Sequence, residues 1–531
     1  MAQIPYRANV QSLAFPLLST LSGQTVIDGQ ADQTYFPQVS TDGAVPVDRG
    51  VPQAFYAHNV MPSTYGWQSV GYKTIINYPA DGAMGFTQAL PVRGAAISGD
   101  TITPLSIIRY ISLASMDGGT SYQAYVTQDS IDAWQKIANG NVNVDGDTVI
   151  SIADVNGYTY ICFSGFGTYV YNPFTDTLHK RTLRGLNDSE ILGITSSNGY
   201  LLAWTYTSVA WSSPVDVEDF EPSDISGAGG GSVQEAKGLL VTAVPTSLGF
   251  ILYTRGNAVS VTFSGNETFP WNFKAIPGSG GITSPFQVSQ RDISGSQYAY
   301  TSYGLQKVWH QKAETAFPSI TDFLAGTVFE DFDSATNTFT QQIPTVAMRK
   351  RVATISDRYL VISYGIAHNL PSTHAIVIDV AQSRYGKLKC LHTLCYERLD
   401  SEPDIVETAR ESIAMLAPDG QVKVVDFSPD ADVTDAVLLL GKYQVQRTYG
   451  VQLQELEVEN VKQGDTFEAL ALPSVNGKTF EPAVPGYLAE EAELSRRYLF
   501  SGPAGKNVSI LFKGRFNLIS VVCWFSLHGR M

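Results

Sequence analysis

The middle of the chain alternates between short apolar, aromatic-rich runs and turn-forming residues. After the turn pair Asn198-Gly199, residues 201–206 form one such run and residues 208–211 form the next. β-branched and aromatic residues beside an Asn-Gly turn predict an antiparallel hairpin. The acidic stretch 212–222 that follows predicts a loop, because its prolines lack a backbone donor for a sheet ladder.

The same order of strand, tight turn and returning strand recurs along the chain. It is predicted at residues 107–126, 158–171, 249–263, 298–309, 359–379 and 413–425. A series of such hairpins is typical of a β-propeller or another radially repeated all-β fold. No exact repeat length is visible, so the repeats have diverged or carry insertions. Helical patterns are brief, for example at residues 130–138.

The two ends of the chain have a different character from the middle. Residues 1–55 lack clear periodicity and carry many Pro, Gly and Asp residues, which predicts an extended N-terminal arm that lies on a neighbouring surface. Residues 441–531 contain further strand-like runs at 443–458, 496–500 and 508–527, which indicate a C-terminal β-sandwich. The predicted fold is therefore all-β, with a β-propeller-like domain over residues 56–440 that carries insertions.

Composition supports a strand-rich protein. Hydrophobic residues make up 44% of the 531 residues and charged residues only 16%. The low charged fraction argues against a disordered chain and against a helix-rich one, since surface helices usually carry many Glu and Lys residues. The 46 glycines, 27 tyrosines and 25 phenylalanines fit many strands joined by many turns.

The net charge of −15 argues against a protein that grips nucleic acid electrostatically, because such proteins are normally basic in at least one domain. The triplet Arg349-Lys350-Arg351 is shorter than a nucleic-acid-binding run, and we interpret it as a solvated strand end. DNA that meets this chain is expected to pass an acidic wall without binding to it.

Cysteine usage and terminal segments bear on localisation. The four cysteines, Cys162, Cys390, Cys395 and Cys523, are too few for a disulfide scaffold in a chain of this length. The first residues lack the pattern of a signal peptide, and the apolar run near 516–527 is too short to span a bilayer. We expect synthesis in a cytoplasm and no stable membrane insertion.

Two sequence patterns resemble metal sites incompletely. One pattern mimics the start of a calcium loop, with Asn141, Asn143, Asp145 and Gly146. The twelfth position of such a loop requires a bidentate Glu, but here it is Ile152, so we interpret the segment as a turn between strands.

Cys390, His392 and Cys395 lie close together, and on a strand the first two share a face while Cys395 points away. No second Cys/His pair completes a zinc site, so we predict no metal.

No catalytic constellation stands out either. The segments 227–232 and 278–281 are Gly-rich but lack the Lys-Ser/Thr ending of a phosphate loop, so we predict flexible connections. Carboxylates in the acidic stretch 216–221 would suit hydrolysis only if a pocket shifted one pKa, and a solvated loop is the simpler interpretation. The seven histidines are scattered. We therefore predict no catalytic residue, no cofactor and no enzymatic activity.

A set of short motifs occurs in a fixed order along the chain. The set begins with the Gly-aromatic step in 59–71 and continues with the strand end Val209-Ala210-Trp211-Ser212-Ser213-Pro214 and the acidic loop Asp219-Phe220-Glu221-Pro222. It goes on with 249–263, 280–285 and 298–309. In this order the motifs resemble the tail nozzle (tail hub or stabilisation) proteins of short-tailed bacteriophages. The resemblance covers about four-fifths of the chain and leaves out the arm before residue 55.

The resemblance implies a structural virion protein that lacks an active site. It implies a homo-oligomer of six copies below the portal and its adaptor (head-to-tail connector) ring, with tail fibre or needle proteins as further partners. Such a ring holds the genome in and then conducts it during ejection, and its place is the virion tail, assembled in the host cytoplasm.

Two other classes of function remain open at this stage. A propeller that binds or degrades polysaccharide is one, because a single fold hosts many functions. A fibre or receptor-binding tail protein is the other, and a trimeric state would favour it.

Overall fold

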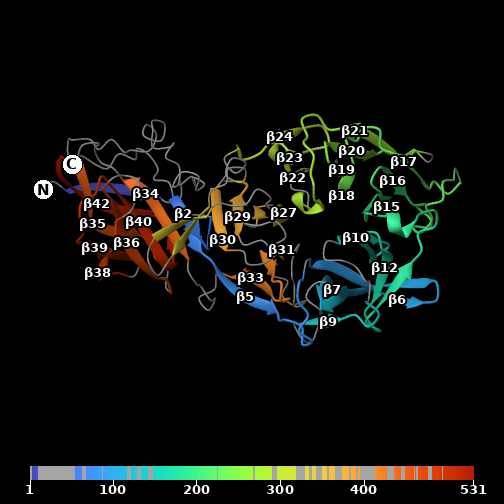
Figure 1. Cartoon of the computed structure of the whole chain (residues 1–531), viewed down its shortest axis with the longest axis horizontal. Helices are drawn as coiled ribbons and strands as arrows, with labels where there is room; N and C mark the ends of the chain where they lie inside the picture. Colours follow the sequence, from blue (N-terminus) through green and yellow to red (C-terminus); the bar gives the residue numbers. More distant parts are fainter. Residues whose placement is uncertain are drawn as a thin grey trace.

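We describe the protein from a computed structural model of the whole chain (Figure 1). The structure describes residues 3–9, 54–62, 67–318 and 324–530 with internal gaps. The gaps are 87, 117–120, 128–132, 141–147, 224, 267–268, 290–295, 325–328, 334–337, 343–349, 356–357, 365–373, 382–383, 390–392, 395–412, 427–435, 444–448, 460, 462–463, 476–480, 493 and 519.

Most of the described chain forms a β-propeller whose sheets, the blades, surround a common axis (Figure 1). Four blades are built from four consecutive antiparallel strands each. Their strands are β6 (Leu90–Ser98), β7 (Thr101–Ser115), β8 (Tyr122–Thr127) and β9 (Trp134–Lys136); β10 (Ile150–Val155), β11 (Tyr158–Phe163), β12 (Gly167–Asn172) and β13 (Thr177–Arg181); β14 (Gly193–Ser197), β15 (Tyr200–Trp204), β16 (Ser208–Trp211) and β17 (Gly229–Ser232); and β18 (Leu240–Thr246), β19 (Gly249–Thr254), β20 (Ala258–Phe263) and β21 (Trp271–Ala275).

Three further blades complete the ring, and the last of them joins the two ends of the propeller. Their strands are β22 (Gln297–Thr301), β23 (Gly304–Val308) and β24 (Ala313–Thr315); β27 (Lys350–Ile355), β28 (Tyr359–Tyr364), β29 (His374–Asp379) and β30 (Arg384–Lys389); and β31 (Thr393–Leu394), β32 (Ala414–Leu416), β33 (Val422–Asp426) and β5 (Gly71–Ile76). The early strand β5 pairs antiparallel with the late strand β33, from Gly71 opposite Asp426 to Ile76 opposite Val422. A strand from the start of the propeller therefore closes its final blade.

Apolar cores between neighbouring blades hold the ring together. Every adjacent pair of blades shares one cluster of buried side chains, including the pair formed by the last and first blades, where Leu416 and Val422 pack with Trp134. Burial of such side chains stabilises the fold by roughly 1.5–3 kcal/mol each. Because the cores follow one another around the axis, the propeller is a closed circle.

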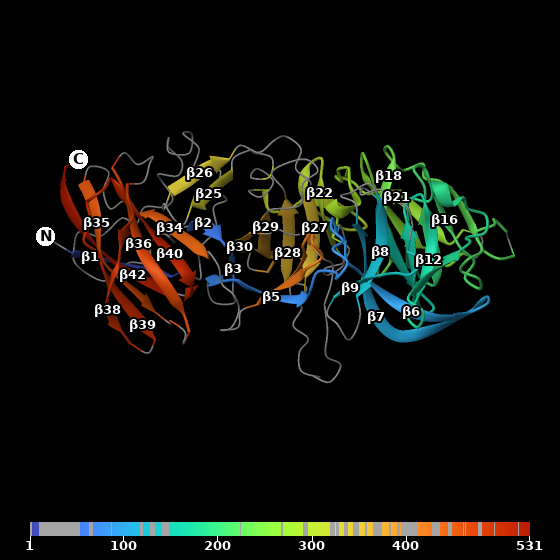
Figure 2. The ribbon, with the colours of Figure 1, turned by 60° about the horizontal axis from the view of Figure 1, so that its bottom comes forward.

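The C-terminal domain is a β-sandwich of two five-stranded sheets, seen at the N- and C-terminal end of the molecule in Figure 2. The first sheet has the order β1-β42-β35-β39-β38 and the second β2-β34-β40-β36-β37. Their strands are β1 (Gln3–Asn9), β42 (Ser520–Arg530), β35 (Tyr449–Glu459), β39 (Ser495–Leu499) and β38 (Tyr487–Glu491), then β2 (Ala54–His58), β34 (Val437–Tyr443), β40 (Asn507–Arg515), β36 (Thr466–Ser474) and β37 (Val484–Pro485).

The sandwich and the propeller are joined by more than a linker. The short strands β3 (Val60–Pro62), β4 (Trp67–Ser69) and β41 (Asn517–Leu518) extend the blade β27–β30 in one continuous sheet. In addition, one core contains blade residues such as Ile362 together with Leu439 and Leu511 of the sandwich. A hairpin of β25 (Phe329–Asp333) and β26 (Thr338–Gln342) and two 3-10 helices, η2 (Asp188–Glu190) and η3 (Pro285–Gln287), complete the described elements.

The local hairpins predicted from the sequence are confirmed. Residues predicted as strand pairs lie in β15–β16, β19–β20, β22–β23, β28–β29 and β32–β33. Asn198 and Gly199 have φ values of 49° and 82°, as the type I′ turn of a two-residue hairpin requires. The all-β class, the propeller and the sandwich are therefore present as the sequence predicts.

One local prediction is wrong. The brief helical pattern at 130–138 contains the strand β9, Trp134–Lys136. The Trp134 indole donates to the carbonyl of Gly420 at 2.5 Å, and its ring packs against Phe86. These contacts with other parts of the chain override the local pattern.

The N-terminal arm predicted for residues 1–55 is described only at its two ends. Its first part, β1, pairs with β42 of the same chain, from Gln3 opposite Ser526 to Asn9 opposite Ser520. β2 likewise pairs with β34. The boundary predicted at 440 falls inside β34, which belongs to the sandwich.

Candidate functional site

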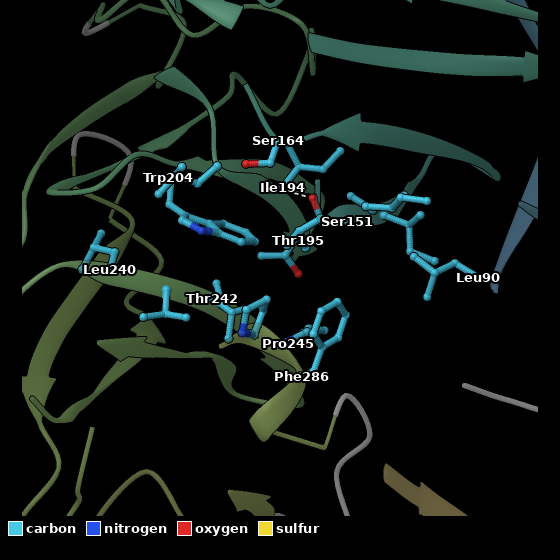
Figure 3. Close-up of a pocket in the computed structure, with 18 of the residues that line it drawn as sticks. Leu90, Ser151, Ser164, Ile194, Thr195, Trp204, Leu240, Thr242, Pro245 and Phe286 are labelled. Carbon is cyan, nitrogen blue, oxygen red and sulfur yellow. Dashed lines mark hydrogen bonds between the residues drawn. The ribbon is translucent and has the colours of Figure 1, made fainter. Parts of the chain in front are cut away.

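A cavity of about 400 Å³ lies on the axis of the propeller, where the innermost strands of several blades meet (Figure 3). Its walls come from residues 88, 90, 91, 149–154, 192, 194–196, 239–243, 245, 283, 285 and 286, together with Ser164, Trp204, Tyr206 and Arg255. The lining includes the exposed residues Asp154, Tyr206 and Arg255, so the cavity reaches solvent. The volume is within the range of about 300–1,000 Å³ that is typical of ligand sites.

Several polar groups around the axial cavity have no hydrogen-bond partner in the described part of the protein. Thr195 and Thr242 are 4% and 5% exposed, and neither hydroxyl takes part in a hydrogen bond with another described residue. The indole nitrogen Nε1 of Trp204 is also unpaired, but it is buried within the wall and has almost no accessible surface. The two threonine hydroxyls are therefore the groups that water or a ligand in the cavity can contact.

Other polar groups of the lining form hydrogen bonds with neighbouring protein groups. Ser151 Oγ accepts a hydrogen bond of 2.9 Å from the amide of Ile194, which Figure 3 draws as a dashed line. Gln88 Oε1 accepts one of 3.3 Å from the amide of Ile150. These bonds fix the inner strands β10 and β14 relative to their neighbours.

Charge is scarce in the axial cavity. Its lining includes one carboxylate, Asp154, which accepts a hydrogen bond from the Thr159 hydroxyl, and one guanidinium, Arg255. The aromatic wall includes Phe286, and the guanidinium carbon of Arg351 lies 4.1 Å from the centre of its ring. No group of three or more potential metal ligands occurs among the described residues.

The acidic loop 216–221, which we considered from the sequence as a source of catalytic carboxylates, connects two segments through ion pairs and hydrogen bonds. Glu218 accepts two hydrogen bonds from Arg181, at 2.7 and 2.9 Å, and a third of 3.0 Å from the Tyr160 hydroxyl. The more exposed Arg184 contacts Asp216 at 2.6 Å and Asp219 at 3.8 Å. The loop is thereby tied to the segment that leaves the preceding blade.

Electrostatics of the acidic loop argue against a general acid there. Partial burial acts to raise the pKa of Asp216, but the hydrogen bonds from Arg184 and the Glu218 amide, together with the nearby guanidinium charges, outweigh it, so the pKa lies below the usual value. A catalytic acid needs a carboxyl pKa that is raised. Burial raises the pKa of Tyr160, and its hydrogen bonds to Tyr158 and Glu218 act in the same direction, so this phenol stays protonated.

The Gly-rich segment 227–232 is not a flexible connection in its second half. Gly229–Ser232 form the strand β17, which pairs with β16. A Cβ atom at Gly229 would lie 2.8 Å from the ring of Trp211, and one at Gly230 would lie 2.9 Å from the carbonyl oxygen of Val209. Glycine is required here by close approach of neighbouring groups. The segment 278–281 is a loop, and there Gly281 approaches the carbonyl of Arg255 closely.

Three candidates from the sequence fall wholly or partly outside the described residues. They are the calcium-like loop with Asn141, Asn143, Asp145 and Gly146, the group Cys390, His392 and Cys395, and Arg349 of the basic triplet. The described cysteines Cys162 and Cys523 are buried free thiols. Burial raises the pKa of Cys162 to about 12, and it raises that of Cys523 further. Neither sulfur is a reactive thiolate at neutral pH.

Comparisons with known proteins leave the function open. No protein-family model matches the chain, and no curated protein matches it. Among solved structures, YCF48 from Cyanidioschyzon merolae is 11% identical with a TM-score of 0.36, over 67% of this chain and 98% of that one. The WD40 beta propeller domain of Doa1 is 9% identical with a TM-score of 0.34, over 66% and 98%. The N-terminal domain of Nup159 is 13% identical with a TM-score of 0.29, over 69% and 98%.

These scores are too low to support an argument about activity or partners. The assignment of a propeller follows from the closed circle of sheets and cores described above. Across the described ranges, no helix is long and apolar enough to cross a bilayer.

Proposed function

We propose that the chain is a structural protein of a short-tailed phage virion, a tail nozzle subunit that assembles into a ring of six copies. The observation that carries the proposal is the joining of propeller and sandwich through one continuous sheet and one shared core. In the described residues, this sheet and core tie the two domains together. The ordered motifs that resemble this family, including Trp211 and the loop around Phe220, give the proposal its specific form.

An acidic ring suits the passage of DNA. The net charge of −15 offers few of the cationic contacts that release counterions from phosphates and so create affinity. Six copies below the portal and its adaptor ring would form a tube that retains the genome and later conducts it. In this role the protein performs no bond-breaking chemistry.

One exposed sheet edge supports contact between subunits. β38 is the last strand of its sheet, and all five of its residues are exposed. Tyr487, 74% exposed, lies opposite Leu499, and Leu494 is 64% exposed in the turn between the strands. Open edges and grouped apolar side chains are where chains associate, so we assign this edge to the contact with a second copy.

The oligomeric state of the purified protein tests the proposal. Native mass spectrometry and electron microscopy are expected to show a closed ring of six, alone or with the adaptor ring. A stable monomer that turns over a glycan, or a trimer, would contradict the nozzle and favour the polysaccharide-acting or receptor-binding alternative. Binding of DNA by the assembled ring that survives dilution at physiological salt would also contradict it.

A pair of matched variants tests the subunit edge. Tyr487→Ser is expected to shift the ring toward smaller species, because it removes the largest apolar side chain of the edge. Tyr303→Ser, at a similarly exposed tyrosine in a propeller turn, is expected to leave the ring intact. Equal behaviour of the two variants would remove β38 from the interface.

A further inference from the structure

We infer that the axial cavity binds a small uncharged carbohydrate, a mono- or disaccharide or a similar polyol. The inference goes beyond the tail function and rests on the cavity alone. It starts from the hydroxyls of Thr195 and Thr242, which make no hydrogen bond with another described residue, and from the aromatic side chains of the cavity wall.

The two hydroxyls come from different strands and meet at one space. Thr195 lies on β14 and Thr242 on β18, and both residues line the cavity together with Trp204 of β15 (Figure 3). Because neither hydroxyl has a described protein partner, both are available for hydrogen bonds to a molecule in the cavity.

The local backbone of β18 contributes to this arrangement. The pairing of β18 with β19 shifts register between Leu240 and Thr242, which marks a bulge. A bulge re-aims the side chains beside it, and bulges occur often next to functional sites. Thr242, directly after this bulge, lies in the cavity wall.

The chemistry of the lining selects against charged ligands. A phosphate or a nucleotide requires several cationic or amide donors, whereas the lining has one guanidinium, Arg255, and also a carboxylate, Asp154. A metal ion requires several carboxylate, imidazole or thiolate ligands, and the described residues contain no such group. The volume of about 400 Å³ is too small for a long peptide segment.

A neutral sugar matches the hydroxyl and aromatic groups of the cavity lining. Threonine hydroxyls both donate and accept hydrogen bonds, which matches the mixed character of sugar hydroxyls. The aromatic side chains of Trp204, Tyr206 and Phe286 provide apolar surface for the C–H groups of a pyranose ring. Apolar walls with a few convergent polar groups are the usual composition of a small-molecule site.

The test uses the full-length protein with defined probes. Saturation-transfer NMR and isothermal titration calorimetry are carried out with methyl glucoside, methyl galactoside, N-acetylglucosamine and maltose as neutral probes. Glucuronate and inorganic phosphate serve as charged ones. At least one neutral sugar is expected to bind saturably and more tightly than both charged probes.

Matched variants place the binding in the cavity. The double variant Thr195→Val/Thr242→Val removes both hydroxyls at nearly constant volume and is expected to weaken binding about tenfold or more. Thr262→Val, on β20 in the same blade as Thr242 but outside the lining, is expected to bind like the wild type. If the double variant does not fold by circular dichroism, Thr242→Val alone is compared with Thr262→Val.

Three results would overturn the inference. They are the absence of saturable binding for every neutral probe, tighter binding of phosphate or glucuronate, and unchanged sugar affinity in the variant that lacks the cavity hydroxyls.

Discussion

The acidic loop 216–221 and the axial cavity are the two polar regions that stand out, and they use their polar groups in opposite ways. In the loop, Glu218 is fully paired with Arg181 and Tyr160. In the cavity, the hydroxyls of Thr195 and Thr242 have no described protein partner. Paired polar groups hold two segments together, whereas unpaired ones leave bonding capacity for another molecule. Polar character alone therefore does not identify a functional site.

The largest expected effect on stability comes from a substitution that breaks an ion pair of the acidic loop. Glu218→Gln removes the charge that pairs with Arg181, and both side chains are only 16% exposed. A fully buried broken pair costs 3–5 kcal/mol, and partial solvent screening reduces the expected loss of unfolding free energy to about 2 kcal/mol. Urea unfolding measures it.

A double-mutant cycle with Arg181→Met is the control for this prediction. The two substitutions together are expected to cost less than the sum of the single ones, because neither then leaves a charge unpaired. Strict additivity would show that the ion pair does not hold the loop.

A smaller effect is expected from Tyr160→Phe. The phenol is completely buried, donates to Glu218 at 3.0 Å and lies 3.0 Å from the Tyr158 hydroxyl. Loss of these bonds is expected to lower the unfolding free energy by about 1 kcal/mol in the same urea assay. Tyr303→Phe, at an exposed tyrosine, is the control and should have no effect. Equal stability of both variants would contradict the role of the Tyr160 hydroxyl.

A pH-dependent effect is expected at His310, a third polar region that is internally paired. Its imidazole contacts Ser260 Oγ at 2.6 Å and Thr246 Oγ1 at 2.7 Å, and burial lowers its pKa below 6.5. The unfolded chain therefore takes up a proton on this residue at higher pH than the folded protein does. The stability that depends on neutral His310 is complete above pH 6.5 and decreases as the pH falls through 6.5 toward the folded pKa.

Thermal unfolding of the wild type and of His310→Asn at two pH values tests this linkage. The wild type is expected to lose more stability between about pH 7.5 and 5.5 than the variant does. Identical pH slopes would show that His310 is not the group responsible.

The smallest effect on stability is expected for a substitution in the axial cavity. Thr195→Val replaces an unpaired hydroxyl by a methyl group, so no protein hydrogen bond is lost. The unfolding free energy is expected to stay within about 0.5 kcal/mol of the wild type or to rise slightly. A clear loss of stability in urea would show that the hydroxyl has a structural partner, and the contrast with Glu218 would fail.

Local sequence signals predicted much of the fold, because most blades are made from consecutive hairpins. The Asn198-Gly199 turn fixes β14–β15 within a few residues, and runs such as 249–254 and 258–263 carry their own strand signal. The closing strand β5 and the sandwich strands β1 and β2 pair with partners near the other end of the chain. No local pattern specifies those partners.

The candidate site was not predictable in the same way. The cavity wall combines Thr195, Trp204 and Thr242 with segments from residue 88 to residue 286, and these meet only when the ring is closed. Each of these residues looks like an ordinary strand residue in the sequence. The acidic loop stood out for the opposite reason, because its charges are contiguous, while its partners Arg181 and Arg184 lie in a separate segment.

The pairing of β5 with β33 has a consequence for biosynthesis. Ile76 leaves the ribosome long before Val422, its partner, has been translated. At ordinary rates of about 5–20 residues per second, the early strand waits for tens of seconds with an open edge. During that interval a nascent polypeptide on the same messenger could pair with the open edge of β5. Chaperone protection or slow early translation would then determine how much of the protein folds as individual chains and how much is lost to such pairing.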